Sequence, residues 1–397
     1  MRSTTLLAAL MPAAQVLAAP SYQHDLPASY FKHFKNPVVK RSAGGKAICV
    51  TGTINIQATA MNIKFNVQQP TNNSVVTEMV QEVDQVGSTY VEDVTGPRVQ
   101  VTSTFGIYSR LCVPAYTGKV DPNSIQFLIH GAGFDGTYWD PAPGYSYIDA
   151  AAEKGFTTFY YDRLGTGLSD HPDPIQIVQL PIQIAIAHEL IQFIRAGNLA
   201  TTKFKHVVGV GHSLGSAQTI GVAGAYPKDL DAIVLTGFSA DGSGAPIAFA
   251  GVGLTIAAQA DRKFAHLSNG YLTASTIQGN QFFFFRQPGF DPAILQLAED
   301  TKGTVTVGEY LGLGVEPAAS FTGPVQILNG QNDLPNCHGD CLYPNNKAKD
   351  AIKLFFPASA PESSWWLAPG TGHGINFHYQ APEAYRHMIH FIEKHGF

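Results

Sequence analysis

Charged residues are scarce in this 397-residue chain. It has 25 Lys and Arg and 30 Asp and Glu, so that 14% of residues are charged and the formal net charge is −5. An average soluble protein has roughly 25% charged residues. The chain has no basic block, and because phosphate binding needs clustered Lys and Arg, nucleic acid is not an expected partner. A hydrophobic fraction of 45% and this length allow a large core with an inserted segment.

Long apolar runs are also missing. The longest one, near the N-terminus, is interrupted by Pro12 and Gln15, and it is shorter than the roughly 20 residues that cross a bilayer. Arg2 precedes it and small residues at 18–19 follow it, which is typical of a cleaved signal peptide. We therefore expect residues 1–19 to direct secretion, and we expect no stable membrane insertion.

A dibasic pair, Lys40-Arg41, precedes the small residues 42–45. Kexin-type proteases of the secretory route cut after such pairs, so residues 20–41 are one candidate for a pro-segment. The other interpretation is an exposed pair in a linker. The sequence favours neither.

There are only four cysteines, which suits an oxidising compartment. Of three possible connectivities, the local one is simplest: Cys49–Cys112 and Cys337–Cys341. A metal site at residues 337–341 is disfavoured, because no second Cys pair lies nearby in the sequence. Asn72-Asn73-Ser74 is the one N-x-Ser/Thr sequon, in a polar stretch that would suit a glycosylated loop.

Hydrophobic periodicity divides the chain into regions. Residues 46–117 alternate apolar and polar side chains and predict β structure, and from residue 124 strands and helices alternate, which predicts a mostly parallel sheet flanked by helices. The alternation stops over residues 240–318, which we expect to form a cap. The expected strands are 125–129, 156–161, 207–210, 232–236, 324–328 and 365–368, and the expected helices are 147–154, 182–195, 214–225, 346–355 and 382–395.

The sharpest motif is Gly211-His212-Ser213-Leu214-Gly215, which lies between a predicted strand and a predicted helix. This is the pattern and context of a nucleophile elbow, in which glycines two residues before and after the serine relieve a crowded turn. Ser213 is the predicted nucleophile. The start of the following helix favours a developing oxyanion.

His130-Gly131-Ala132-Gly133 ends an earlier predicted strand. A turn of this kind can aim a backbone N–H at the space above Ser213, so Ala132 and Leu214 are the predicted oxyanion donors. The role requires backbone amides, and His130 is therefore expected to be structural.

A base and an acid should follow the nucleophile in the order Ser, Asp, His. Asp333 follows one predicted strand through a turn, and His373 follows the last strand between glycines. His373 would accept the proton of Ser213, and Asp333 would orient the ring. Asp241, which follows the strand ending at residue 236, is the rival acid; rival histidines are His212, His378, His387, His390 and His395.

Two further segments are ambiguous. Residues 161–169 (YDRLGTGLS) partly resemble a phosphate-binding loop, but they lack the Gly-Lys-Ser/Thr signature. They are expected to form a tight turn held by Asp162. The run Phe282 to Phe285 fits either plain core or an apolar wall for a substrate.

Together these motifs resemble the α/β-hydrolase superfamily, in particular its cap-bearing esterases and lactonases, from about residue 125 to the C-terminus. With the signal, the dibasic pair and the cysteines, the chain is similar to secreted fungal members. The resemblance implies an α/β-hydrolase fold with a core of residues 42–239 and 319–397, a cap of residues 240–318 and an extended N-terminal β region. It also implies an acyl-enzyme mechanism without metal or organic cofactor.

The expected function is hydrolysis of an ester or lactone of a largely apolar small molecule. An acyltransferase or thioesterase of secondary metabolism, a lyase with the same triad, and a non-catalytic binding protein on a hydrolase scaffold are the alternatives. An Asp nucleophile, as in epoxide hydrolases and haloalkane dehalogenases, is excluded by Ser213.

Overall fold

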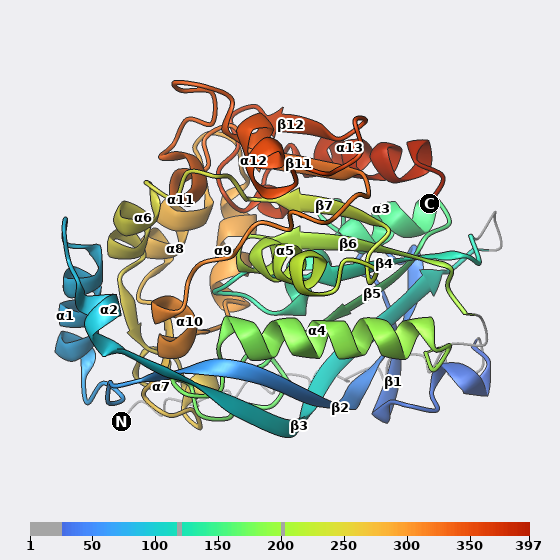
Figure 1. Ribbon diagram of the computed structural model, residues 1–397. Coiled ribbons are helices and arrows are strands. Elements are labelled where there is room, and N and C mark those ends of the chain that lie inside the picture. Colours follow the sequence, from blue (N-terminus) through green and yellow to red (C-terminus); the bar gives the residue numbers. More distant parts are fainter. Residues whose placement is uncertain (1–25, 117–120, 200–202) are drawn as a thin grey trace, which may run out of the picture.

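The computed structural model describes residues 26–116, 121–199 and 203–397 (Figure 1). Its centre is a nine-stranded sheet in the order β1-β2-β3-β5-β4-β6-β7-β11-β12. The first four strands in this order pair antiparallel, and β5, β4, β6, β7, β11 and β12 are parallel to one another. The predicted mostly parallel sheet with an N-terminal β extension is therefore confirmed.

The strands of this sheet are β1 (Lys35–Arg41), β2 (Ala47–Phe65), β3 (Thr95–Pro114), β4 (Ser124–Ile129), β5 (Thr157–Tyr161), β6 (His206–His212), β7 (Ala232–Thr236), β11 (Val325–Gly330) and β12 (Ser364–Ala368). The helices beside it are α3 (Tyr147–Glu153), α4 (Leu180–Arg195), α5 (Leu214–Ala225), α11 (Leu334–Cys337), α12 (Lys347–Phe355) and α13 (Ala381–Lys394). Every strand of the parallel part except the edge strand β12 is almost completely buried, as expected where helices cover both faces.

Two hydrophobic clusters lie on the two faces of the sheet. The apolar side of α4, with residues of α5 and α12, packs on one face. Residues of α3 and α13 pack on the other. The carboxyl ends of β4, β6, β11 and β12 point the same way, so the loops after these parallel strands share one edge.

The N-terminal region departs from the predicted β structure at its middle. β2 and β3 form a long hairpin that pairs from Ala47↔Pro114 to Phe65↔Thr95, and its tip carries two helices, α1 (Asn73–Asp84) and α2 (Tyr90–Val94). Asn72 caps α1 by accepting the N–H groups of Ser74 and Val75. The prediction was wrong here because one short helix inside a strand-rich stretch gives a weak periodic signal.

Residues 240–318, the segment predicted to form a cap, fold into short helices and a small sheet. The segment contains α6 (Ala245–Val252), α7 (Ala257–Ala260), α8 (Ile277–Phe284), α9 (Pro292–Asp300) and α10 (Val307–Leu311), with a small antiparallel sheet of β8 (Leu254–Ile256), β9 (Tyr271–Ala274) and β10 (Val305–Thr306). Asn73 accepts a hydrogen bond from the N–H of Ile256 at 2.8 Å, so the hairpin tip packs on this cap. None of the described helices is long and apolar enough to span a membrane.

Both disulfides form in the predicted local pairing. Cys49–Cys112 joins directly opposed residues of β2 and β3 across a separation of 63 residues, and Cys337–Cys341 closes a separation of 4. The signal peptide predicted at residues 1–19 lies outside the described residues.

The dibasic pair lies in β1 rather than in a linker. Lys40 and Arg41 are register partners of Cys49 and Ile48 in β2. Phe34, just before this strand, is 6% exposed and belongs to the hydrophobic cluster on the α4 face. Removal of residues 20–41 stays a prediction, and such cleavage would take an edge strand from the sheet.

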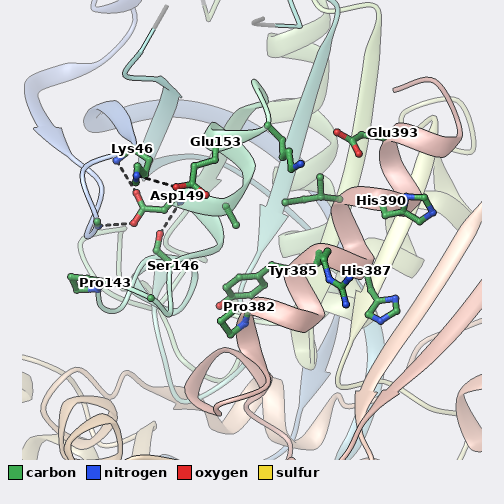
Figure 2. A pocket seen from close by; sticks show the side chains of 16 residues that line it. Lys46, Pro143, Ser146, Asp149, Glu153, Pro382, Tyr385, His387, His390 and Glu393 are labelled. Atoms are coloured by element: carbon green, nitrogen blue, oxygen red, sulfur yellow. Dashed lines mark hydrogen bonds and ion pairs between the residues drawn. The ribbon is translucent and has the colours of Figure 1, made fainter. Parts of the chain in front are cut away.

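Two carboxylates hold the residues after β1. Asp149 of α3 accepts the N–H groups of Gly44 and Lys46 at 2.6 and 3.0 Å (Figure 2). Asp140 accepts the N–H of Ala43 at 2.9 Å and the hydroxyl of Ser146 at 2.6 Å. The Gly-rich segment is therefore anchored, because its amides find buried acceptors.

Asp140 is expected to make stability depend on pH. Burial raises its pKa to about 6, although the hydrogen bonds from Ser146 and Ala43 lower it. Its pKa is higher in the folded than in the unfolded state, so the folded state binds the proton more tightly and stability falls as pH rises from about 4 to 6. Asp140→Asn, whose Oδ1 can accept the same two bonds, should raise the free energy of unfolding by about 1–2 kcal/mol at pH 8, discounted for partial exposure, and by less at pH 4. Urea unfolding at both pH values measures this, and an equal effect at both would contradict it.

Candidate active site

Ser213 lies in a strained turn between β6 and α5. Its backbone has φ 54° and ψ −119°, in a region that side chains rarely adopt. A Cβ at Gly211 would lie 2.6 Å from Cα of Ser216, and a Cβ at Gly215 would lie 2.1 Å from the carbonyl oxygen of Ile129. Both positions therefore require glycine, and the structure has the geometry of the predicted elbow.

His373 and Asp333 lie beside this serine. His373 Nε2 is 2.8 Å from Oγ of Ser213, and His373 Nδ1 is 2.8 Å from Oδ2 of Asp333. Asp333 and His373 are fully buried, whereas Ser213 is partly exposed. They follow β11 and β12, whose carboxyl ends lie at the same edge of the sheet as the end of β6. The structure thus brings together three residues that are separated by 120 and 40 positions in the sequence.

One more residue holds the carboxylate, and sequence reasoning missed it. The N–H of Asn336 donates to Oδ1 of Asp333 at 2.9 Å, while its side chain donates to the carbonyl of Gly237 at 2.9 Å. Asn336 stands in the short helix α11, which Asp333 caps and which the Cys337–Cys341 disulfide closes. The Asp-x-x-Asn spacing of an N-cap was the signal available in the sequence.

The rival acid is engaged elsewhere. Asp241 forms an ion pair with Lys347. Partial burial raises the pKa of its carboxyl, but the hydrogen bonds from Lys347 and Ser243 lower this pKa to about 2. Its carboxylate makes no hydrogen bond or ion pair with His373 among the described residues. Of the two carboxylates considered, the structure places Asp333 against the imidazole.

The rival histidines have structural partners. His378 Nε2 accepts the N–H groups of Arg286 and Gly372 at 3.0 and 3.1 Å, and burial lowers its pKa to about 4. The ring of His212 stacks on Tyr138 and lies 5.0 Å from that of His373, with Nδ1 3.0 Å from the hydroxyl of Thr236. His387 stacks on Trp366, and His390 and His395 stand with it on α13 or at its end.

The turn at residues 130–133 approaches the serine closely. A Cβ at Gly131 would lie 2.9 Å from Cβ of Ser213. Neither the N–H of Ala132 nor that of Leu214 donates a hydrogen bond within the described part of the chain. The helix start and the turn are in direct contact, as the close approach of Gly215 to Ile129 shows. Two amides without a hydrogen-bond partner among the described residues thus lie in segments that adjoin Ser213, as an oxyanion site requires.

A sequence model of the alpha/beta hydrolase family matches residues 127–387. This span contains Ala132, Ser213, Asp333 and His373 and exceeds half of the 397 residues. The chain belongs to the alpha/beta hydrolase family. No curated protein matches it.

Several solved structures are similar to this chain in fold. A thermophilic esterase from Thermogutta terrifontis is 12% identical, with a TM-score of 0.49, over 73% of this chain and 94% of that one. An alpha/beta hydrolase fold protein from Chitinophaga pinensis is 16% identical, with a TM-score of 0.47, over 73% and 93%. Rv0554 from Mycobacterium tuberculosis is 15% identical, with a TM-score of 0.48, over 75% and 96%. At these identities the likeness concerns the fold alone.

The four consecutive phenylalanines, residues 282–285, have different surroundings in this hydrolase. The rings of Phe283 and Phe284 lie 5.5 and 5.7 Å from that of His373, so the end of α8 covers the imidazole. Phe285 stacks on Phe377, which belongs to the core, and Phe282 is 46% exposed. Phe283, Phe284 and Phe285 belong to the core cluster, and a role for Phe283 and Phe284 as an apolar wall for a substrate stays a prediction.

A small hollow adjoins the oxyanion turn. It measures about 30 Å³ and is lined mainly by apolar cap residues, together with Ala132 and Gly133 of the turn. The cap residues are Phe249, Val252, Leu254, Thr273, Ala274, Asn280, Phe283, Phe284 and Val305. Because its volume is about that of one water in the liquid, it admits only a short group without rearrangement.

A larger hollow of about 870 Å³ lies elsewhere, between α3 and α13 (Figure 2). It is lined by both acidic and basic side chains, such as Lys46, Glu153, His390 and Glu393, and by none of the residues at the elbow. The small hollow, in contrast, is lined by Ala132 and Gly133 of the turn that approaches Ser213, and by Phe283 and Phe284, whose rings lie near that of His373.

The described residues contain no group of three or more His, Cys, Asp or Glu side chains arranged to hold a metal. At residues 337–341, both sulfurs are joined in a disulfide.

The turn at residues 161–169 is held by Asp162, as predicted. The carboxylate of Asp162 accepts a hydrogen bond from Arg110 at 2.6 Å and from the N–H groups of Gly136 and Leu168, each at 2.9 Å.

Proposed function

We propose that this protein is a serine hydrolase that cleaves an ester or lactone bond through an acyl-enzyme intermediate. The supporting observation is the continuous hydrogen-bonded series from Ser213 through His373 to Asp333. Such a series lets an imidazole accept the hydroxyl proton as the oxygen attacks, while the carboxylate stabilises the imidazolium.

The reaction proceeds in two halves. Ser213 Oγ attacks the acyl carbon, its proton passes to Nε2 of His373, and the N–H groups of Ala132 and Leu214 stabilise the oxyanion. His373 then protonates the leaving alcohol. In the second half the imidazole takes a proton from water as the water oxygen attacks the acyl carbon, and His373 returns that proton to Ser213 Oγ as the acid is released. No step needs a cofactor.

We also propose that the protein is secreted and acts outside the cell, as in the fungal members that the sequence resembles. All four cysteines are paired in disulfides, which persist in oxidising compartments. The signal peptide predicted from the sequence at residues 1–19 is the second support.

The apolar lining of the small hollow supports an apolar substrate with a short acyl group. With p-nitrophenyl esters, kcat/KM should be highest for acetate or propionate and at least tenfold lower for octanoate, because about 30 Å³ holds little more than a methyl group. Hydrolysis of a set of lactones of increasing ring size, measured by acid release, shows whether the enzyme prefers cyclic or open-chain esters.

Val252→Ala enlarges this hollow and should shift the preference towards longer acyl groups. Val207→Ala is the matched control, since Val207 is buried at the opposite end of β6 from Ser213. An octanoate preference in the wild type, unchanged in Val252→Ala, would show that the acyl group binds elsewhere.

A further inference from the structure

The carbonyl of Gly131 accepts hydrogen bonds from two buried side chains. His130 Nδ1 lies 2.8 Å from this oxygen, and Arg163 Nη2 lies 3.3 Å from it. The N–H of Arg163 donates to His130 Nε2 at 3.0 Å, so Nε2 is the acceptor and Nδ1 carries the proton. Burial, with the nearby Arg163, lowers the pKa of His130 well below its usual value and keeps the ring neutral.

These bonds bear on the proposed oxyanion site because of peptide geometry. In a trans peptide the carbonyl of one residue and the N–H of the next lie in one plane and point in opposite directions. His130 and Arg163 hold the oxygen of Gly131 on their side of the peptide. The N–H of Ala132 therefore points away from them, where it has no partner among the described residues. Without the two donors this plane could rotate, and the amide would lose its orientation.

Arg163 is itself held by the cap. It forms an ion pair with Glu309 of α10, and both side chains are almost fully buried. Gln183 bridges them, accepting from Arg163 and donating to Glu309, each at 2.8 Å. The second oxygen of Glu309 accepts the N–H of Thr306 at 2.9 Å in a capping box.

The cap also binds the turn directly. The N–H of Gly303 donates to the carbonyl of Gly133 at 2.8 Å, and the N–H of Gly133 lies 3.4 Å from the carbonyl of Thr304. Residues 303–309 thus contact the turn along its backbone and support the arginine that fixes Gly131. A buried ion pair adds little stability compared with apolar residues of the same size, so its position beside this turn calls for another explanation.

We propose that the Arg163–Glu309 pair positions the Ala132 amide for the oxyanion, and that the seated cap thereby completes the oxyanion site. This inference rests on the proposed serine-hydrolase function. Arg163 and Glu309 are positioning residues that act through Gly131, because neither makes a hydrogen bond or ion pair with Ser213 or His373 in the described part of the chain.

Steady-state kinetics of Arg163→Lys and Glu309→Gln with p-nitrophenyl acetate test the proposal. A lysine ammonium cannot reproduce the arginine fork, and a neutral glutamine weakens the hold on Arg163. We expect kcat to fall about 10- to 100-fold with KM changed less than threefold, because the oxyanion exists only in the transition state. The affinity of a trifluoromethyl ketone, whose adduct with serine carries an oxyanion, should fall by the same factor as kcat/KM.

Arg110→Lys is the matched control. Arg110 is also buried and pairs with Asp162, next to Arg163 in the sequence, but among the described residues it makes no hydrogen bond or ion pair with residues 130–133. It should lower the melting temperature while kcat stays within threefold of the wild type. If Arg163→Lys or Glu309→Gln does not fold, Gln183→Met, which removes the bridge together with the hydrogen bond from Gln218, should show the same pattern to a smaller degree.

The outcomes separate this inference from the proposed function. A wild-type protein whose Ser213 reacts with a fluorophosphonate, together with folded pair variants that keep wild-type kcat and ketone affinity, would overturn the inference alone. Equal losses in Arg110→Lys and Arg163→Lys would assign the pair to general stability and also overturn it. A wild-type protein that forms no adduct would overturn both.

Discussion

Replacing Ser213 with alanine is expected to lower kcat for ester hydrolysis by a factor on the order of 10⁴ or more. Without Oγ there is no nucleophile and no acyl-enzyme, and the remaining rate comes only from binding and the free amides of the oxyanion site. Substrate affinity should change little, because the hydroxyl is a small part of the site. Intact mass after fluorophosphonate treatment should show one adduct on the wild type and none on Ser213→Ala.

Ser216→Ala is the control for this experiment. Ser216 is buried three residues further along α5, where its hydroxyl donates to the carbonyl of Thr236 at 2.9 Å, so it tests the loss of a serine near the elbow without loss of the nucleophile. It should keep the adduct and kcat within about tenfold. Unchanged turnover in Ser213→Ala would refute the serine mechanism, and absence of any turnover or adduct in the folded wild type would favour the binding-protein alternative.

Local sequence signals account for the parts of the site that were predicted. A serine between two glycines, flanked by a strand and a small-residue helix, specifies one turn, because only glycine fits at Gly211 and Gly215. Asp333 and His373 follow apolar strands, and the rule that parallel strands end at one edge brings their loops to the elbow. The disulfide pairing could also be predicted from local sequence, because one bridge joins cysteines that are close in sequence and the other joins the two strands of one hairpin.

Long-range partners could not be predicted in this way. Arg163 and Glu309 are 146 positions apart, and nothing in either segment indicates the other. Their pairing depends on how the cap folds over the core, and residues 240–318 have no strong period from which to derive that. The helix α1 was missed for a different reason: it is a single helix inside a strand-rich stretch, where its periodic signal is weak.

Asp333→Asn is expected to lower kcat by about 10³- to 10⁴-fold at neutral pH. An asparagine can still accept the N–H of Asn336 through Oδ1, so the loop should fold as before. Its amide nitrogen would then face Nδ1 of His373 and donate to it, which makes Nδ1 the acceptor and moves the ring proton to Nε2. A protonated Nε2 cannot accept the proton of Ser213, so the nucleophile is no longer activated.

Asp241→Asn is the matched control, because it changes the rival carboxylate in the same way. It breaks the ion pair with Lys347 at a partly exposed position, so a stability loss of roughly 1 kcal/mol or less and near-wild-type kcat are expected. The reverse result, with Asp241→Asn inactive and Asp333→Asn active, would place the acid after β7 and require the loop after β11 to move. Comparing the two variants therefore decides which carboxylate orients the imidazole, since each removes one charge and leaves the other loop intact.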